Sequence, residues 1–208
     1  MPNWAEQREA LVEHLSERES LDSGTLRALR AVPRHQFVPE PRRQAAYEDR
    51  PLPIGSGQTI SAPHMVAVMT DLLALQSATN VLEIGTGCGY HAAVTAECVG
   101  AENVYSVEYH DDLAERARDT LARVGYDGIE VRSGDGKEGW PEHAPFDRAY
   151  FTCAADEFPQ PVVDQVSSGG RLLAPIGTRS QTLVLARKRD DGTLAREKHG
   201  QVRFVPLQ

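Results

Sequence analysis

A short apolar strand that runs into a glycine-rich turn constrains this chain more than any other feature. Residues 81–84 are strand-forming, and Gly85, Gly87 and Gly89 follow at alternate positions before helix-forming sequence begins at Tyr90. Glycine has no Cβ, so such a turn lets backbone N–H groups approach a ligand closely at the start of a helix. The pattern predicts a strand, a tight turn and a helix. A ligand site at the turn is favoured, and a simple strand-to-helix corner is the alternative.

The spacing of these glycines indicates the kind of ligand. Dinucleotide-binding turns carry G-x-G-x-x-G, whereas this chain has G-x-G-x-G with the acidic Glu83 shortly before it. That arrangement fits S-adenosylmethionine better than NAD. The rest of the chain must support this interpretation.

Beyond residue 63 the sequence alternates between strand and helix patterns. Helices are predicted at 64–75, 90–99, 111–124 and 159–166, and strands at 80–84, 104–108, 129–133, 147–152, 171–175, 182–187 and 202–207. Such alternation is typical of an α/β fold with a mostly parallel sheet and helices on both faces. The last strands flank a turn at 190–192 and form an antiparallel addition.

The first 63 residues differ from this pattern. Two short helices are predicted between residues 4 and 30, separated at 22–24, where Ser23 is a candidate cap. Residues 32–63 are rich in Pro, Gly and Gln and are predicted to form an ordered loop without regular structure. Because long ordered loops usually carry function, residues 51–64 are a candidate site. We expect one domain over 1–208, with the helices and loop in 1–63 and a Rossmann-like core in 64–208.

Composition argues against several classes of function. The net charge is −8 and no basic cluster with interleaved aromatics is present, which disfavours nucleic-acid binding. No apolar run approaches the roughly 20 residues that cross a bilayer, and the N-terminus lacks the pattern of a signal peptide. Cys88, Cys98 and Cys153 are scattered, so neither a disulfide framework nor a zinc site is indicated. We expect a cytoplasmic monomer without metal, and no nucleic-acid or membrane partner.

Three strand ends supply groups that fit an adenosine. In open α/β sheets, ligands bind beyond the carboxyl ends of the strands. The glycine turn follows one such strand, Glu108 closes the next, and Asp135 and Gly136 follow the third. The Glu108 carboxylate can accept both ribose hydroxyls. Asp135 can accept the adenine amine, and the backbone at Gly136 lets the ring approach.

Six segments match one family in order along the chain. They are VPRHQFVP at 32–39, LPIGSGQTISAPHM at 52–65, the glycine turn, GDGKEGW at 134–140, GGRL at 169–172 and VRFVPL at 202–207. On these residues the chain resembles protein-L-isoaspartate O-methyltransferases. The resemblance implies a Rossmann-like, S-adenosylmethionine-dependent methyltransferase. It also implies methylation of the free α-carboxylate of L-isoaspartyl residues in damaged proteins and peptides, which initiates their repair.

The resemblance also implies where donor and acceptor meet. Ser61 occupies the position usually designated catalytic. Donor-site roles are implied for Gln58, Thr59, Ile60, Ser61, His64, Gly85, Thr86, Gly87, Cys88, Gly89, Glu108, Asp135 and Gly136. Two departures concern the site: Cys88 stands where relatives often have Ser, and the acidic Asp156 and Glu157 stand where relatives tend to be apolar. Because the sequence stops at Gln208, a closing C-terminal segment is expected to be shorter or absent.

The chemistry of this acceptor limits what the chain must supply. The free α-carboxylate has a pKa near ~3.5 and arrives ionised, so no general base is needed. Ser61 is therefore interpreted as a donor that positions the carboxylate, and a cap on the following helix is a second role for it. Two other functions stay open. One is an S-adenosylmethionine enzyme for another acceptor, which the missing Asn/Asp-Pro-Pro-Tyr/Phe motif disfavours. The other is a donor-binding protein with lost or altered acceptor specificity.

Overall fold

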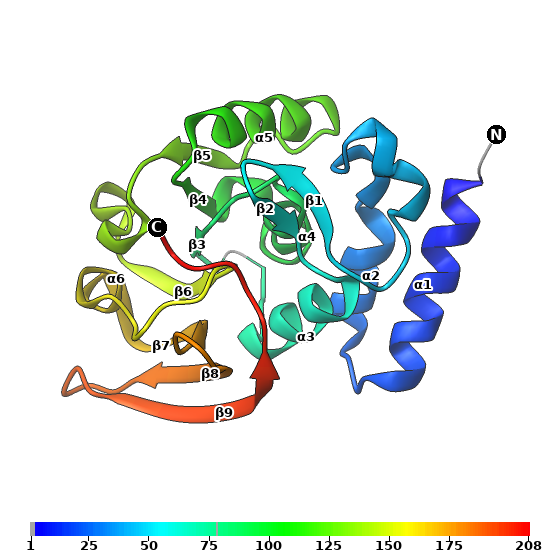
Figure 1. Ribbon diagram of the computed structural model, residues 1–208. Coiled ribbons are helices and arrows are strands. Elements are labelled where there is room, and N and C mark those ends of the chain that lie inside the picture. Colours follow the sequence, from blue (N-terminus) through cyan, green and yellow to red (C-terminus); the bar gives the residue numbers. More distant parts are fainter. Residues whose placement is uncertain (1–2, 78) are drawn as a thin grey trace.

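The computed structural model describes residues 3–77 and 79–208, and its centre is a seven-stranded sheet (Figure 1). The strands lie in the order β5-β4-β3-β6-β7-β8-β9. Their bounds are β3 Val81–Ile84, β4 Val104–Glu108, β5 Glu130–Ser133, β6 Phe146–Phe151, β7 Val166–Ile176, β8 Gln181–Lys188 and β9 Leu194–Val202. Neighbours from β5 to β7 pair in parallel, and β8 and β9 are antiparallel additions. The predicted α/β sheet is confirmed.

Helices cover both faces of this sheet, as predicted (Figure 1). They are α1 Trp4–Arg18, α2 Ser23–Ala31, α3 Pro63–Leu73, α4 Tyr90–Val99, α5 Asp111–Arg123 and α6 Gln160–Gln165, with 3-10 turns η1 Arg34–Gln36, η2 Glu40–Ala45, η3 Ala101–Asn103, η4 Gly136–Glu138 and η5 Pro141–His143. One buried apolar cluster packs the helices from α1 through α5 against one face of the sheet. A second buried cluster packs α6 against the other face. Within the described residues, no helix is long and apolar enough to span a membrane.

The central strand β3 shows how local sequence produces this arrangement. All four of its residues are buried. Leu82 and Ile84 belong to one apolar cluster, and Val81 belongs to the other. Successive side chains of a strand point to opposite faces, so a nearly continuous apolar run suits a strand that is covered on both sides. The glycine turn therefore begins at the carboxyl edge of the sheet, beside the end of β4.

Residues 52–60 form a hairpin, so the prediction of an irregular loop was wrong there. β1 Leu52–Gly55 and β2 Gln58–Ile60 pair antiparallel in a two-stranded sheet of their own. Between them Gly55, Ser56 and Gly57 have φ of 102°, 50° and 71°. Strands this short, one of them containing Pro53, leave too little alternation for a sequence pattern to detect.

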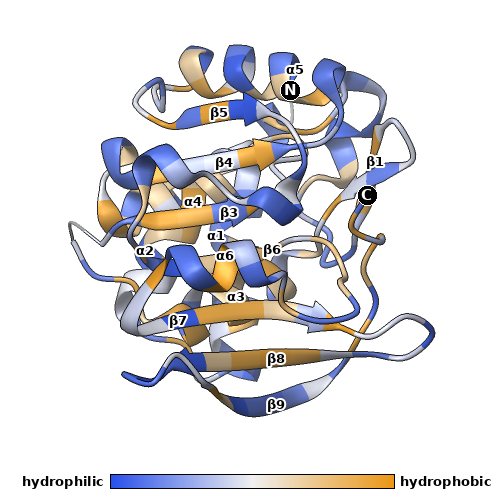
Figure 2. Cartoon of the chain, turned by 90° about the vertical axis from the view of Figure 1, so that its left-hand side faces the viewer, coloured by the Kyte–Doolittle hydropathy of each residue, from blue (hydrophilic) through white to orange (hydrophobic). Residues whose placement is uncertain are grey.

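Two predictions about element ends were also wrong. The last strand is β9 Leu194–Val202 rather than residues 202–207. Figure 2 shows β9 as mostly hydrophilic, which is typical of an exposed edge strand and hides it from an apolar pattern. Residues beyond it leave the sheet, and the Ala154 N–H donates to the Val205 carbonyl at 2.8 Å. At α2 the cap is Asp22, which accepts from the Thr25 N–H, rather than Ser23.

Candidate functional site

A cavity of about 740 Å³, counted out to its mouth, opens at the carboxyl ends of β3 and β4. Four segments form most of its wall: hairpin residues 58–61, turn residues 85–88, residues 107–110 at the end of β4, and residues 205–208. The remaining lining residues are Val66, Ile84, Tyr90, His91, Gly136, Thr152 and Cys153. Ligands of open α/β sheets bind at this edge, so the cavity lies where the sequence predicted a site.

The cavity brings together most of the residues predicted to contact the donor. Those that line it are Gln58, Thr59, Ile60, Ser61, Gly85, Thr86, Gly87, Cys88, Glu108 and Gly136. His64, Gly89 and Asp135 are not among the lining residues. The His64 Nδ1 lies 2.8 Å from an Asp49 carboxylate oxygen, and Asp135 accepts from the Lys137 N–H at 2.8 Å. Donor contacts stay predictions for all of these residues, whether or not they line the cavity.

Two glycines are required by close packing around the cavity. Gly85 has φ of 96°, and a Cβ there would collide with the Thr152 hydroxyl, which donates to the Gly85 carbonyl. At Gly136 a Cβ would collide with Cγ2 of Ile84. Close packing against these side chains therefore requires glycine at two positions that line the cavity.

Glu108 shapes the glycine turn as well as facing the cavity. Its side chain is 5% exposed, and its two oxygens accept from the Gly87 N–H at 2.8 Å and the His110 N–H at 3.0 Å. A carboxylate has about four lone-pair sites, so both oxygens keep capacity for ribose hydroxyls. The ribose contact stays a prediction, and the structure shows that Glu108 also has a structural role in the turn.

Ser61 lines the cavity and does not cap the helix that follows it. The α3 helix has Ala62 at its N-cap position with no side-chain cap bond. Instead, Asp49 accepts from the His64 N–H at 2.9 Å in the first turn of α3. Within the described residues, the Ser61 hydroxyl forms no hydrogen bond, so it is free to donate to a ligand.

Arg34 holds the backbone of Ser61 from behind. This arginine is fully buried, and its guanidinium donates to the Ala46 and Ser61 carbonyls, each at 2.8 Å. It also lies 4.8 Å from the ring centroid of Tyr90, the first residue after the glycine turn. Burial lowers the pKa of Arg34, and Tyr90 and Cys88 partly oppose this. One buried side chain thus joins the hairpin segment to the turn.

Comparison with known proteins identifies the family. The family model described as protein-L-isoaspartate(D-aspartate) O-methyltransferase matches residues 6–208. The chain belongs to this family. It is 50% identical over 207 residues to an Archaeoglobus fulgidus protein named protein-L-isoaspartate O-methyltransferase 2, covering 99% of this chain and 94% of that protein. It is 52% identical over 203 residues to a Methanoculleus marisnigri protein named protein-L-isoaspartate O-methyltransferase, and this match covers 97% of this chain and 91% of that protein.

Solved structures agree with this isoaspartyl methyltransferase family. One titled protein-L-isoaspartate O-methyltransferase superposes with a TM-score of 0.89 at 30% sequence identity. The match covers 97% of this chain and 66% of that longer chain. The fold described above is therefore the fold of this family.

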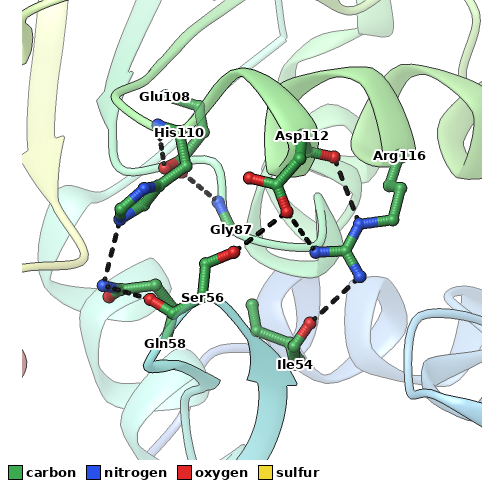
Figure 3. Close-up of polar contacts among 8 residues, drawn as sticks. All are labelled: Ile54, Ser56, Gln58, Gly87, Glu108, His110, Asp112 and Arg116. Atoms are coloured by element: carbon green, nitrogen blue, oxygen red, sulfur yellow. Dashed lines mark hydrogen bonds and ion pairs between the residues drawn. The ribbon is translucent and has the colours of Figure 1, made fainter.

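In this member of the family, the hairpin is fastened over the glycine turn by polar contacts at its tip (Figure 3). Ser56 donates to the Asp112 carboxylate at 2.9 Å, and Arg116 donates to the same carboxylate at 3.1 Å. Arg116 also reaches the Ile54 carbonyl, and Gln58 lies 3.4 Å from the His110 ring. We call the three residues Ser56, Asp112 and Arg116 the latch. The contacts among these three residues are solvent-exposed, so they can break at low cost.

Behind the turn lies a buried carboxyl that is not paired with a cation in the described residues. Register pairs Glu83 with Ser106 on β4 and Tyr150 on β6. Both hydroxyls donate to it, at 2.5 and 2.8 Å, and the Ser106 hydroxyl also contacts that of Thr86 at 2.6 Å. Burial raises the pKa of Glu83 from 4.5 to about 8, and the nearby Glu108 adds to this. Glu83 is therefore mostly protonated at neutral pH.

The cavity also contains thiols and an imidazole that do not serve as ionised groups. Burial raises the pKa of Cys88 to about 11 and that of Cys153 to about 12, and it lowers the pKa of His91 to about 3. No group of three or more His, Cys, Asp or Glu within residues 3–77 and 79–208 is placed to hold a metal ion.

Sequence reasoning missed several residues that line the cavity. Tyr109 and His110 follow Glu108 directly, and Thr152 and Cys153 follow β6. Their position after a parallel strand was the available signal. Residues 205–208 were also missed: the VRFVPL motif marked the family without assigning a role, and the closing segment was expected to be shorter or absent. These residues nevertheless form part of the wall.

Proposed function

We propose that this chain transfers the methyl group of S-adenosyl-L-methionine to the free α-carboxylate of L-isoaspartyl residues in damaged proteins and peptides, which initiates their repair. The observation that carries the proposal is that Ser61 and the glycine turn face one cavity. The family match over residues 6–208 supports the same reaction.

The residues of the cavity fit the methyl donor. Glu108 keeps lone pairs for two ribose hydroxyls, and Gly87 and Gly136 leave backbone open to the ligand. When bound, S-adenosylmethionine supplies an electrophilic methyl group on a sulfonium. In the proposal His64, Gly89 and Asp135 assist from outside the lining, Asp135 by turning from Lys137 toward the adenine amine.

Ser61 orients the acceptor in this proposal. Its free hydroxyl donates to one oxygen of the ionised α-carboxylate and directs the other oxygen toward the methyl group, with Arg34 fixing the Ser61 backbone. Charge is neutralised in the transition state, so a site that excludes water favours the reaction. The hairpin and residues 205–208 supply that exclusion. No residue has to remove a proton.

We further propose that residues 1–208 act as a single methyltransferase domain, as a monomer in the cytoplasm. Cys88, Cys98 and Cys153 are free thiols, which suits a reducing compartment. The partners are isoaspartyl-containing proteins and peptides, without nucleic acid or membrane.

A methyl-transfer assay tests this function. The enzyme is incubated with radiolabelled S-adenosylmethionine and either an isoaspartyl peptide or its aspartyl twin. Label is expected on the isoaspartyl peptide only. Donor binding without transfer would instead favour a family member with lost or altered acceptor specificity, and label on the aspartyl twin would contradict the proposed acceptor.

The Ser61→Ala variant tests the assigned role. Loss of one hydrogen bond to a charged group is expected to lower turnover by roughly ten- to a few hundredfold, with little change in donor affinity. The melting temperature of the variant should equal that of the wild type, because the Ser61 hydroxyl has no hydrogen-bond partner in the described residues. Ser61→Thr, which keeps a hydroxyl, should recover part of the rate. Unchanged turnover per folded molecule would refute the role, and near-total loss with a methyl-serine adduct would indicate a covalent nucleophile.

A further inference from the structure

A second cavity, of about 560 Å³ counted to its mouth, lies behind the glycine turn. Three arginines line it: Arg43 from η2, and Arg116 and Arg123 from α5. The other lining residues are mostly apolar or uncharged: Gln36, Phe37, Val38, Pro39, Ile54, Gly87, Cys88, Leu113 and Thr120. We call this cavity the arginine groove. An apolar floor between basic walls suits a polypeptide segment that carries carboxylates.

The positive charge of the arginine groove is only partly compensated. No Asp or Glu is among its lining residues, although the chain as a whole has a net charge of −8. Arg116 pairs with Asp112, but neither Arg43 nor Arg123 is within ion-pair distance of a carboxylate in the described residues. The buried Nε of Arg43 has no hydrogen-bond partner there, and Arg123 reaches only two neutral oxygens, at 3.4 Å. Two guanidinium groups are thus available to an anion.

The arginine groove adjoins the methyl-transfer cavity. Both are lined by Gly87 and Cys88, and the hairpin separates them, with β2 on the first cavity and Ile54 of β1 on the second. Paired strands lie about 4.8 Å apart, so the hairpin is about 10 Å wide with its side chains. An extended chain covers about 3.4 Å per residue. A polypeptide whose isoaspartyl residue sits at Ser61 therefore needs about three residues to cross the hairpin, so residues from about the third onward reach the groove.

We propose that the arginine groove binds acidic side chains of the client polypeptide, three to six residues from the isoaspartyl residue. The proposal rests on the proposed function, since it assumes that the client enters at Ser61. It makes the enzyme selective for isoaspartyl residues in acidic, unfolded segments. Charge complementarity favours an acidic segment, because its carboxylates can pair with both free arginines. A basic segment would be repelled.

Two peptides that differ in charge test the proposal. Each contains one isoaspartyl residue, and positions three to six residues away on both sides carry either glutamates or glutamines. Wild-type enzyme is expected to methylate the glutamate peptide with a kcat/KM about three- to twentyfold higher at low salt. The doubly substituted Arg43→Gln, Arg123→Gln variant should lose this preference while it methylates the glutamine peptide at the wild-type rate. Arg189→Gln, which changes an exposed arginine after β8, is the control and should keep the preference.

Direct binding separates failure of this proposal from failure of the proposed function. Fluorescence anisotropy of both labelled peptides, with S-adenosylhomocysteine present, gives the same affinity ratio without any methyl transfer. Equal affinities in the wild type would overturn the arginine groove as a client site, and so would a preference that survives in the double variant. Absent methylation of both peptides, with a charge-dependent difference in binding, would refute the proposed function and keep the groove.

Discussion

At the scale of single residues, the position of Ser61 depends on a buried charge. The guanidinium of Arg34 has a planar fork of donors, and it uses this fork to hold two carbonyls from separate segments, Ala46 and Ser61. Lysine carries a point charge on a flexible stem and cannot reproduce that geometry. The backbone of Ser61 is thus held by a residue that does not itself line the cavity.

Arg34→Lys is expected to lower kcat by about tenfold per folded molecule, because the Ser61 backbone loses a charge-assisted hydrogen bond. Donor affinity, measured by calorimetry, should change little. Arg148→Lys is the matched control, since Arg148 also donates to backbone carbonyls, at Leu73 and Asp147, but does not line the cavity. Equal losses of kcat in the two variants would mean that Arg34 acts only on stability.

Single residues of the site differed in how well they could be predicted. The glycine turn, Glu108 and Ser61 lie in compact motifs, so spacing and family resemblance identified them. The role of Arg34 could not be predicted, because its partners lie 12 and 27 positions away along the chain. The arginine groove was hidden for the same reason, since α5 and the segment after η1 meet only in the folded chain.

At the scale of elements, the hairpin is attached partly through contacts that are exposed to solvent. It belongs to a separate two-stranded sheet, and the latch fastens its tip through exposed contacts. Its strands are too short to show a recognisable period of apolar residues. The longer central strands and the helices were predicted from such periods. The edge strand β9 was missed because its exposed positions carry charged or uncharged polar residues and a glycine, not an apolar pattern.

Asp112→Asn should loosen the latch, because the substitution removes the charge that Ser56 and Arg116 share. Product release is then expected to be about two- to fivefold faster at low salt, as for other exposed charge contacts. Stopped-flow release of S-adenosylhomocysteine measures this, and 1 M salt should reduce the difference. Asp119→Asn, on the same helix, should release product at the wild-type rate. Identical release from all three enzymes would show that the latch does not control the hairpin.

At the scale of the whole molecule, the buried Glu83 ties stability to pH. Its pKa rises from 4.5 in the unfolded chain to about 8 in the fold, because burial disfavours the charged form. Its stabilising contribution is complete below pH 4.5 and is lost as pH rises toward 8, since the unfolded chain releases this proton first. The sequence marked Glu83 as acidic, but its burial follows from the register with β4 and β6.

Glu83→Gln should remove this dependence, because an amide keeps the shape of the carboxyl without titrating. The free energy of unfolding is measured in urea at pH 5, 6, 7 and 8 for both proteins. The free energy of unfolding of the wild type minus that of the variant should fall with rising pH, by at most about 1.4 kcal/mol per pH unit. The contributions of other titrating groups are the same in both proteins and cancel in this difference of free energies. Parallel profiles would mean that the carboxyl is already ionised in the fold.

The methyl-transfer cavity is lined by segments that are synthesised at very different times. The hairpin residues 58–61 leave the ribosome early, whereas residues 205–208, which complete the same wall, are made last among the lining segments. Domains fold as units during synthesis, and contacts between distant segments form slowly. A nascent chain therefore has its glycine turn long before it has an enclosed binding site. It gains the capacity to repair other proteins only after its own synthesis has passed the last strand of the sheet.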